Sequence, residues 1–312
     1  MTVPSIAEGR VDEIFATVKN WGRWGPDDQL GALNFITPEV VRSAAALATL
    51  GQVVSCSLPL PTAPSAEEIS PAQHMMTASG DALDATGIPG FQQTTDYLGI
   101  ACHGMGITHL DALCHVLVGD RMYNNVPASE VKSTGATTNS LGAPARGIVT
   151  RGVLLDIPRV RDTEWLELGD AVLPEDLDAA AARAGVVVRS GDALLVSTGR
   201  DARRRALGPW SPFAGLAGLH PECLPWLADH EVAVLCGDGI SDILPPDFTS
   251  GWAFPIHQCA IAGMGLHLID NLALDALADA CMEASRWEFL FSVAPLRAEQ
   301  ATGCADNPVA VL

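Results

Sequence analysis

Apolar residues recur along the chain with the two periods that distinguish helices from strands. In residues 7–21, Val11, Ile14 and Val18 are spaced by three and four positions, so they share one face of a helix. We therefore expect an amphipathic helix there, as part of a helical arm over about residues 1–50.

A second helix is marked by the residues at its ends. Thr37 is a suitable N-cap and Pro38 suits the first helical position. Gly51 follows the last apolar residues and is a typical terminator. These signals predict a helix over residues 37–51. Comparable patterns predict helices over residues 174–185, 221–230 and 274–281.

Runs of β-branched and leucine residues predict buried strands. The clearest is GIVTRGVLLDI at residues 147–157, and residues 289–296 alternate apolar with polar side chains. Strands interspersed with helices favour a layered α/β fold with a mixed sheet. Because no internal repeat or low-complexity linker interrupts the chain, residues 1–312 are expected to form one domain. Further strands are expected over residues 53–60, 192–197 and 232–236.

One long segment has no periodic pattern. Residues 61–98 are rich in Pro, Ser, Thr, Gly and Asp, a composition typical of loops. Loops of this length inside a compact domain tend to be lids or oligomer contacts. We expect a mobile loop.

Composition limits the classes of partner. The chain carries a formal net charge of −19, with 18 basic residues in total, which argues against nucleic acid or an anionic membrane as a partner. A small or neutral molecule is the expected substrate. Residues 1–15 lack a secretory signal pattern and no apolar stretch is long enough to span a membrane, so a cytoplasmic location is expected. The eight cysteines form no C-x-x-C pair, which fits reduced thiols.

Polar residues follow two of the predicted strands. Arg200 is a candidate ligand for a substrate carboxylate, but the charged residues beside it, Asp201 and residues 203–205, favour a solvated helix face. Asp238 and Asp242 follow the next strand. They either accept hydrogen bonds from metal-ligating histidines or form turns.

Candidate chemistry is concentrated in residues 101–116, ACHGMGITHLDALCHV, which contain three of the eight histidines and one carboxylate. His109 and Asp111 stand two positions apart, so an extended chain points both side chains to one face. Asp111 and His115 meet only if the chain turns helical after the aspartate. The stretch is therefore interpreted as a strand followed by a first helical turn.

His103 has the same parity as His109, but a straight strand would hold the two residues about 20 Å apart. Ligands of one metal ion must each lie about 2 Å from it. Gly104 and Gly106 permit the bend that would return His103 to the cluster. The imidazoles and the carboxylate suit a divalent ion such as zinc, manganese or iron. Unrelated core or surface histidines are the alternative, but burying such polar groups without partners costs roughly 1 to 3 kcal/mol each.

Residues 108–115, Thr-His-Leu-Asp-Ala-Leu-Cys-His, resemble the His-x-Gly-Thr-His-x-Asp-x-Pro-x-His signature of the metal-dependent cyclase-like hydrolases. That family includes bacterial kynurenine formamidase and isatin hydrolase. The signature's first histidine falls on Met105, its glycine on Ile107 and its proline on Leu113, and His103 is a displaced substitute. Further family motifs recur in order over most of the chain, at residues 24–34, 122–124, 151–156, 197–200 and 255–258.

The resemblance implies the swivelling β/β/α fold and a homo-oligomer, either a dimer or a tetramer. It gives His109, Asp111 and the downstream His257 metal-ligand roles, and His115 the role of proton donor and acceptor. His103 joins the metal ligands as the substitute for the missing first histidine.

The resemblance also bears on the number of ions and on the substrate. The family's glutamate partner falls on Ile269, and Asp270 comes one residue later, so one ion is expected rather than two. Trp24 belongs to a loop that the resemblance places on the substrate side. Gln258 and Asp270 are further candidate substrate contacts.

The expected activity follows from these groups. An ion held by two imidazoles and a carboxylate can polarise a carbonyl and lower the pKa of bound water to about 7, while a neutral imidazole moves the proton. We expect arylformamidase-like hydrolysis of a small amide, formamide, cyclic imide or lactone, with zinc or manganese as the ion. The alternatives are a metal-dependent cyclase or dehydratase of secondary metabolism, and a binding homologue without turnover.

Overall fold

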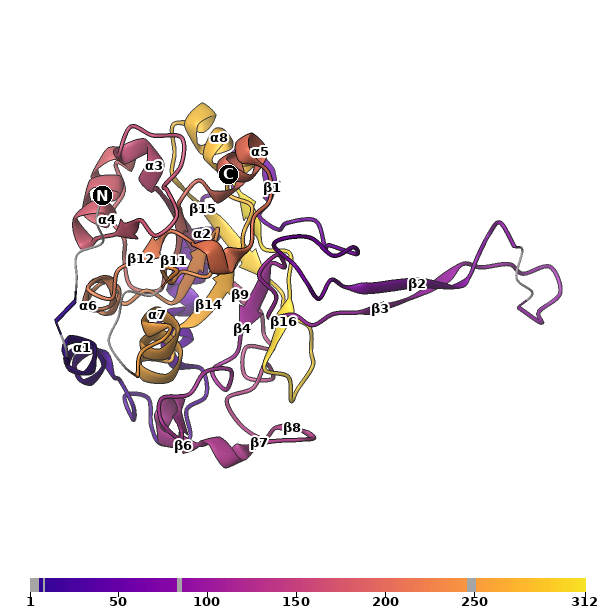
Figure 1. The fold of residues 1–312 in the computed structure, drawn as a ribbon, viewed down its shortest axis with the longest axis horizontal. Coiled ribbons are helices and arrows are strands. Elements are labelled where there is room, and N and C mark those ends of the chain that lie inside the picture. Colours follow the sequence, from indigo (N-terminus) through magenta and orange to yellow (C-terminus); the bar gives the residue numbers. More distant parts are fainter. Residues whose placement is uncertain (1–5, 8, 83–85, 246–250) are drawn as a thin grey trace.

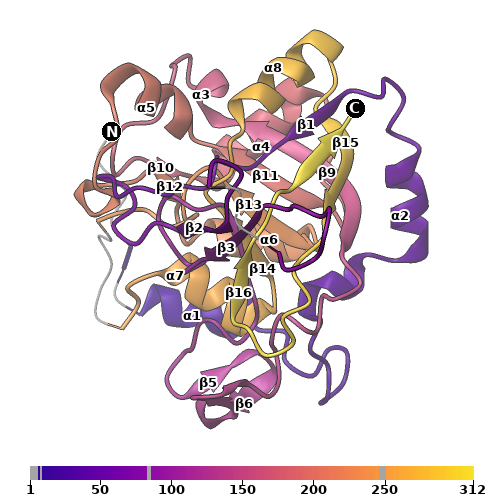
Figure 2. The same ribbon diagram turned by 90° about the vertical axis from the view of Figure 1, so that its right-hand side faces the viewer.

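The computed structural model describes residues 6–7, 9–82, 86–245 and 251–312. Within these ranges, the main sheet has nine strands (Figures 1 and 2). Four neighbouring strands, β9, β11, β13 and β14, run parallel, and the strands on both sides of them are antiparallel. The predicted α/β fold with a mixed sheet is confirmed. In spatial order the strands are β1 (Val53–Ser55), β17 (Val309–Val311), β15 (Glu288–Val293), β9 (Ile148–Asp156), β11 (Ala193–Ser197), β13 (Val234–Gly237), β14 (His267–Asp270), β4 (His109–Asp111) and β16 (Gly303–Ala305).

The sheet separates two hydrophobic cores. In β11, Leu194 and Val196 face one core and Leu195 faces the other, because successive side chains of a strand point to opposite faces. Parallel strands buried on both faces read as continuous apolar runs, which is why the sequence predicts them well. The first core also contains side chains from α1, α4, α6 and the π-helix η5, and the second contains side chains from α8.

Two of the predicted helix signals are visible in the structure. The Thr37 hydroxyl accepts a hydrogen bond from Val40 N at 3.3 Å, and Gly185 ends a helix with a φ of 67°. The helices are α1 (Arg10–Val18), η1 (Gly31–Phe35), α2 (Pro38–Ala45), η2 (Tyr123–Asn125), η3 (Ala128–Glu130), α3 (Ile157–Val160), α4 (Pro174–Ala184), α5 (Arg200–Leu207), η4 (Pro212–Ala214), α6 (Cys223–Asp229), α7 (Pro255–His257), η5 (Gln258–Met264) and α8 (Asp275–Ala284).

The long segment expected to be a loop instead contains a two-stranded hairpin. Strands β2 (Gln73–Ala78) and β3 (Thr95–Gly99) pair with each other and project from the body, as Figure 1 shows. We call residues 73–99 the hairpin arm. Its strands are exposed along nearly their whole length. Since neither face is buried, the sequence has no apolar alternation that would reveal them.

Three shorter strand pairs complete the described structure. They are β5 (Arg121–Met122) with β6 (Val126–Pro127), β7 (Val131–Lys132) with β8 (Gly135–Ala136), and β10 (Ala171–Val172) with β12 (Gly218–Leu219).

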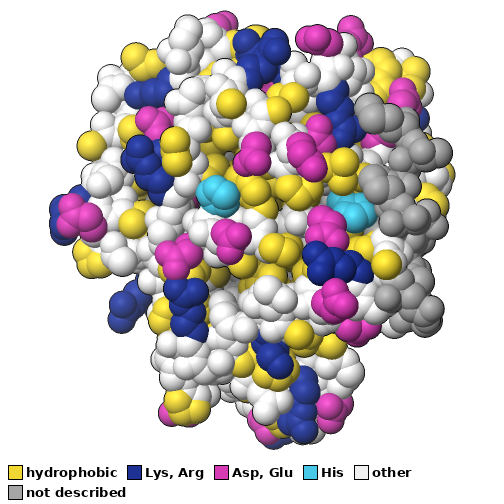
Figure 3. Space-filling model, turned by 90° about the vertical axis from the view of Figure 1, so that its left-hand side faces the viewer, with side chains coloured by type: hydrophobic (Ala, Val, Ile, Leu, Met, Phe, Trp, Pro, Cys, Tyr) yellow, Lys and Arg dark blue, Asp and Glu magenta, His cyan; other side chains and the backbone are white. Residues whose placement is uncertain are grey.

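The described surface and helices also bear on possible partners. On the face away from the hairpin arm, Lys and Arg side chains are scattered among Asp and Glu side chains (Figure 3). Among the described residues, no helix combines the length and the apolar character that crossing a membrane requires.

Candidate metal centre

The centre is built on two antiparallel strands at the end of the parallel part of the sheet. His109 and Asp111 belong to β4, and Asp270 of β14 is the register partner of His109. Directly opposed residues of an antiparallel pair point to the same face. Leu110 and Ile269 point to the other face, into the second core. The ladder therefore places three polar side chains together on one face of the sheet.

The loop before β4 returns His103 to this face. His103 Nδ1 lies 2.8 Å from Asp111 Oδ1, and its Nε2 lies 3.0 Å from Thr302 Oγ1. The His103 ring also stacks on the His115 ring, with centroids 3.7 Å apart. Thr302 was not predicted, because it lies 199 positions from His103 in the sequence and no local pattern connects the two residues.

His115 approaches the centre through a turn. Its backbone N–H donates to Ala112 O at 2.9 Å, and no helix begins there, so the predicted first helical turn is wrong. The turn still brings His115 Nε2 to 3.9 Å from Asp111 Oδ1. The three residues between Asp111 and His115 are enough to reverse the chain after β4.

His257 enters from α7 on the first-core side. Its Nε2 lies 3.2 Å from Asp270 Oδ2 and 3.6 Å from Asp111 Oδ2. Its Nδ1 lies 2.6 Å from Asp242 Oδ2, and the same carboxylate accepts the backbone N–H of Ile256 at 2.8 Å. Asp242 thus has the histidine-orienting role that the sequence left open, and it fixes both the ring and the start of its helix.

A contact with the backbone fixes the orientation of the His109 ring. His109 Nδ1 lies 2.8 Å from Ile107 O, and a carbonyl oxygen only accepts hydrogen bonds, so this nitrogen carries a proton. His109 Nε2 is then the free ligand atom, and it lies 3.5 Å from Asp111 Oδ1. Asp238 has a different role from Asp242, because its carboxylate accepts the backbone N–H groups of residues 198–200.

Burial and neighbouring charges set the protonation states. Burial raises the pKa of Asp111, but its hydrogen bond with His103 and the surrounding histidines outweigh that effect and hold the pKa well below its usual range. Burial lowers the pKa of His103, but its contacts with Asp111 and Cys102 raise the net pKa to about 9. A metal ion bound through His103 must therefore displace a proton.

The donor set fits a divalent metal ion. In the part of the chain that the structure describes, two groups have ligand atoms that all lie within 4.8 Å of one another: His103, His109 and Asp111, and Asp111, His257 and Asp270. Asp111 belongs to both groups. Asp111 Oδ2 and Asp270 Oδ1 are buried and have no hydrogen-bond partner among the described residues, as expected of oxygens that serve a cation. Each group can hold a metal ion.

A cavity of about 360 Å³ opens onto these side chains. Gln258 and Asp270 line it, as do both groups of candidate ligands, His115, Met105, Val116, Leu117, Ile240 and Phe254. Its lining, as far as the described residues extend, contains no lysine or arginine. A larger hollow of about 700 Å³ lies beside Leu30, Val41 and Pro144. Because none of the candidate ligands is among the described residues that line the larger hollow, the chemistry places the site in the smaller cavity.

Trp24 and Arg200 lie in surroundings that differ from those expected from the sequence. Trp24 is not among the described residues that line it, and packs edge-on against Phe35 with ring centroids 5.1 Å apart. Arg200 does not lie on a solvated helix face, because its side chain is buried and contacts Asp238 O and Asn271 Oδ1. Residues that are distant in sequence enclose the Arg200 side chain, so its neighbours in the sequence could not predict that it is buried.

His267 lies on β14 but outside both groups of candidate ligands. It is fully buried, and neither ring nitrogen has a hydrogen-bond partner among the described residues. Burial disfavours the charged ring and lowers its pKa from 6.5 to about 4. The folded protein therefore takes up a proton at this position only at a lower pH than the unfolded chain does.

This difference predicts an acid-sensitive stability that His267→Leu removes. Between about pH 6.5 and 4 the unfolded chain binds a proton at this position that the folded protein does not, so the wild type loses stability as the pH falls. Relative to His267→Leu, its free energy of unfolding should drop by about 1.4 kcal/mol per pH unit in this window. Urea unfolding of both proteins at neutral and mildly acidic pH measures it. The same stability difference at both pH values would contradict the prediction.

Comparisons with known proteins agree with this architecture. The model of the family described as Cyclase matches residues 54–241, and a search of curated proteins gives no match. A crystal structure of a novel cyclase is 28% identical, with a TM-score of 0.86 over 95% of this chain and 100% of that chain.

Two isatin hydrolase structures share the fold. One, bound to the product analogue thioisatinate, is 18% identical with a TM-score of 0.56, over 89% of this chain and 99% of that chain. Isatin hydrolase A from Ralstonia solanacearum is 20% identical with a TM-score of 0.55, over 88% of this chain and 98% of that chain. Since the family model matches more than half of the residues, this chain belongs to the cyclase family.

Proposed function

We propose that the protein is a metal-dependent hydrolase that cleaves an amide, formamide, cyclic imide or lactone bond in a small molecule. The observation that carries the proposal is the pair of ligand groups that share Asp111 at one end of a cavity, with His115 beside them and outside both groups. This arrangement separates the residues that hold an ion from a residue that is free to move a proton.

Zinc or manganese is the proposed ion. Mixed imidazole and carboxylate ligands suit both. When bound, such an ion polarises the substrate carbonyl and makes water more acidic. His103, His109, Asp111, His257 and Asp270 would hold it, and Asp270 is better placed for this role than for contacting substrate, since it is buried beside His257.

His115 and Gln258 would act on the substrate side. The His115 imidazole is part-exposed in the cavity, so it can accept a proton from the attacking water and return it to the leaving nitrogen or oxygen. Gln258 accepts the backbone N–H of Phe254 at 3.1 Å through Oε1. It therefore shapes the cavity wall by holding Phe254 in place.

The cavity favours a small uncharged substrate. Its volume of about 360 Å³ lies at the lower end of the 300 to 1,000 Å³ that is usual for small-molecule sites. Apolar side chains from Val116, Leu117, Ile240 and Phe254 provide much of the wall. The described lining contains no lysine or arginine, so a substrate carboxylate would have no cationic partner there other than the histidines and the ion itself.

Metal analysis combined with a substrate screen tests the function. Elemental analysis of the purified protein should find bound zinc or manganese, and the loaded protein should hydrolyse a member of a panel of N-formyl aromatic amines, cyclic amides and lactones. A chelator should abolish turnover, and adding the ion back should restore it. A protein that binds metal but only eliminates water from or cyclises such substrates would instead be a cyclase or dehydratase, and one that binds no metal would contradict the proposal.

We also propose that the protein forms a homo-oligomer through the hairpin arm, in the reducing conditions of the cytoplasm. An isolated two-stranded hairpin is marginally stable in water, and Met75, Tyr97 and Leu98 leave about half of their surface exposed. The described strands of the arm carry only one acidic residue, Asp96, which pairs with His74 at 2.9 Å. On a chain with a net charge of −19, these two strands, with one carboxylate between them, are where two copies can meet with little repulsion.

Shortening the arm is expected to dissociate the oligomer. Replacing residues 74–98 with a short Gly-Ser turn removes the exposed apolar strands. The main sheet should remain, because among the described strands β2 and β3 pair only with each other. Sedimentation velocity should show an oligomer for the wild type and a monomer for the shortened chain. Equal sedimentation coefficients, after correction for mass, would argue against this role of the arm.

A further inference from the structure

We propose that Asn271 is a positioning residue that holds the loop carrying His103 against the metal centre. The inference rests on the proposed metal-dependent function. Asn271 directly follows Asp270, and its backbone adopts a left-handed conformation with a φ of 57°. Its side chain is fully buried. This conformation turns the amide away from β14 and toward the loop that precedes β4.

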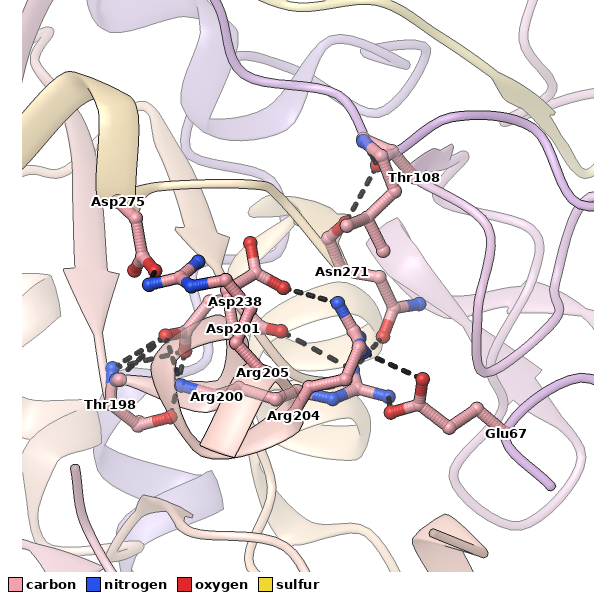
Figure 4. A network of polar contacts seen from close by, with 12 residues as sticks. Glu67, Thr108, Thr198, Arg200, Asp201, Arg204, Arg205, Asp238, Asn271 and Asp275 are labelled. Atoms are coloured by element: carbon pink, nitrogen blue, oxygen red, sulfur yellow. Dashed lines mark hydrogen bonds and ion pairs between the residues drawn. The ribbon is translucent and has the colours of Figure 1, made fainter. Parts of the chain in front are cut away.

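The Asn271 amide binds this loop at two points. Its Nδ2 donates to Gly104 O at 3.0 Å and to Ile107 O at 3.1 Å. Thr108 Oγ1 in turn donates to the Asn271 carbonyl at 2.6 Å (Figure 4). The end of β14 is therefore joined to both ends of the segment between His103 and His109.

Arg200 supports the amide from behind. Its guanidinium donates to Asn271 Oδ1, to Asp238 O at 3.2 Å and to Met105 O at 2.8 Å. Figure 4 shows this side chain between Asn271 and Glu67. Because the Arg200 side chain is only 3% exposed, its planar donors are held in one arrangement. Arg200 thus fixes the amide and the middle of the loop at the same time.

The other side of the loop rests on Glu68. Its Oε2 accepts the backbone N–H of Gly106 at 3.1 Å. A Cβ at Gly104 would lie 2.1 Å from the same oxygen, so a larger residue there would displace the Glu68 carboxylate. Two glycines in a short loop raise the conformational entropy that is lost when the loop is ordered. The contacts with Asn271, Arg200 and Glu68 offset that cost.

These contacts reach both histidines of the first ligand group. At one end the loop carries His103, whose Nδ1 meets Asp111 Oδ1. At the other end Ile107 O accepts both Asn271 Nδ2 and His109 Nδ1. The amide therefore acts on the position of one ligand and on the tautomer of the other. It contacts neither ring directly, which is why its role is positioning.

Asn271→Gly tests the inference, because glycine tolerates the left-handed backbone and removes only the amide. Zinc affinity of the metal-free protein, measured by competition with a chromophoric chelator, should fall about 10- to 100-fold, the usual effect of losing a residue that orients ligands. Amide hydrogen exchange at Gly106 in the metal-free protein should accelerate. Asn271→Asp, which keeps the acceptor for Arg200 but loses both donors to the loop, should show the same two changes.

Asn124→Gly is the matched control. Asn124 is also left-handed, with a φ of 61°, and its amide donates to three backbone carbonyls of the loop at residues 25–28. Its substitution should leave zinc affinity and Gly106 exchange unchanged. Unchanged affinity and exchange in a folded Asn271→Gly protein would overturn the inference. If that variant does not fold, the same result for Asn271→Asp would overturn it. If the wild-type protein does not bind zinc, the proposed function is contradicted. The rate of amide hydrogen exchange at Gly106 in Asn271→Gly would then still test whether Asn271 holds the loop.

Discussion

Asp111→Asn is expected to abolish tight metal binding. Asp111 is the one residue common to both ligand groups, and its neighbours hold its pKa well below the usual range, so it supplies a full negative charge at neutral pH. Asparagine keeps the size of the side chain but removes that charge. Since losing a residue that merely orients a ligand costs about 10- to 100-fold in affinity, losing the shared ligand should cost more.

Elemental analysis by mass spectrometry after purification measures this effect, and chelator competition gives the affinity. Asp242→Asn is expected to have a smaller effect, because Asp242 orients His257 but belongs to neither ligand group. Its metal affinity should therefore fall by a smaller factor than that of Asp111→Asn. His74→Ala, on the exposed hairpin arm, is the control that should retain the ion. Stoichiometric metal in Asp111→Asn would show that the ligands have been assigned wrongly.

His115→Asn is expected to lower kcat by about 10²- to 10⁴-fold, the usual contribution of a general base, while leaving the metal bound. The ring stacks on His103 and its Nε2 lies 3.9 Å from Asp111 Oδ1, farther from that oxygen than His103 Nδ1 or His109 Nε2. It is close enough to reach a water molecule beside the ion and too far to complete either ligand group. Single-turnover kinetics together with metal analysis separate the two effects.

The pH dependence of the rate is a second test of the role of His115. Burial lowers the pKa of His115 to about 4, so its imidazole is neutral and able to accept a proton at neutral pH. The rate should decline as the pH falls through that pKa, and His115→Asn should lose this acid limb. Loss of the ion, or wild-type turnover with an unchanged acid limb, would show that His115 is a ligand or a bystander.

The elements that the sequence predicts best are those with local signals. Thr37 and Gly185 mark helix ends by their own chemistry, and the apolar run of β9 marks a strand buried on both faces. Strands β16 and β17 have three residues each, too few to show a period. Their place in the sheet depends on partners that are distant in sequence. The same is true of β14, whose register against β4 cannot be read from either strand alone.

The candidate site divides in the same way. The spacing of His109 and Asp111 predicts their common face because both lie on one strand. The surroundings of Arg200 could not be predicted from its charged neighbours, since its partners Asp238 and Asn271 directly follow two other strands, β13 and β14. Thr302 and Glu68 also contact the His103 loop from afar. The contact of Trp24 with Phe35 could not be predicted either, because a motif does not specify which residues its loop packs against.

The pairing of His109 with Asp270 across the ladder restricts how this site can change during evolution or in the laboratory. A single residue inserted into β4 or β14 would exchange the two faces of the strand and send the ligands into the second core. Residues 103–107 are not in a ladder, so a substitution there leaves the register of β4 against β14 unchanged and acts on the centre through the position of His103. Variant libraries that seek a different metal preference should therefore randomise that loop and leave residues 109–111 untouched.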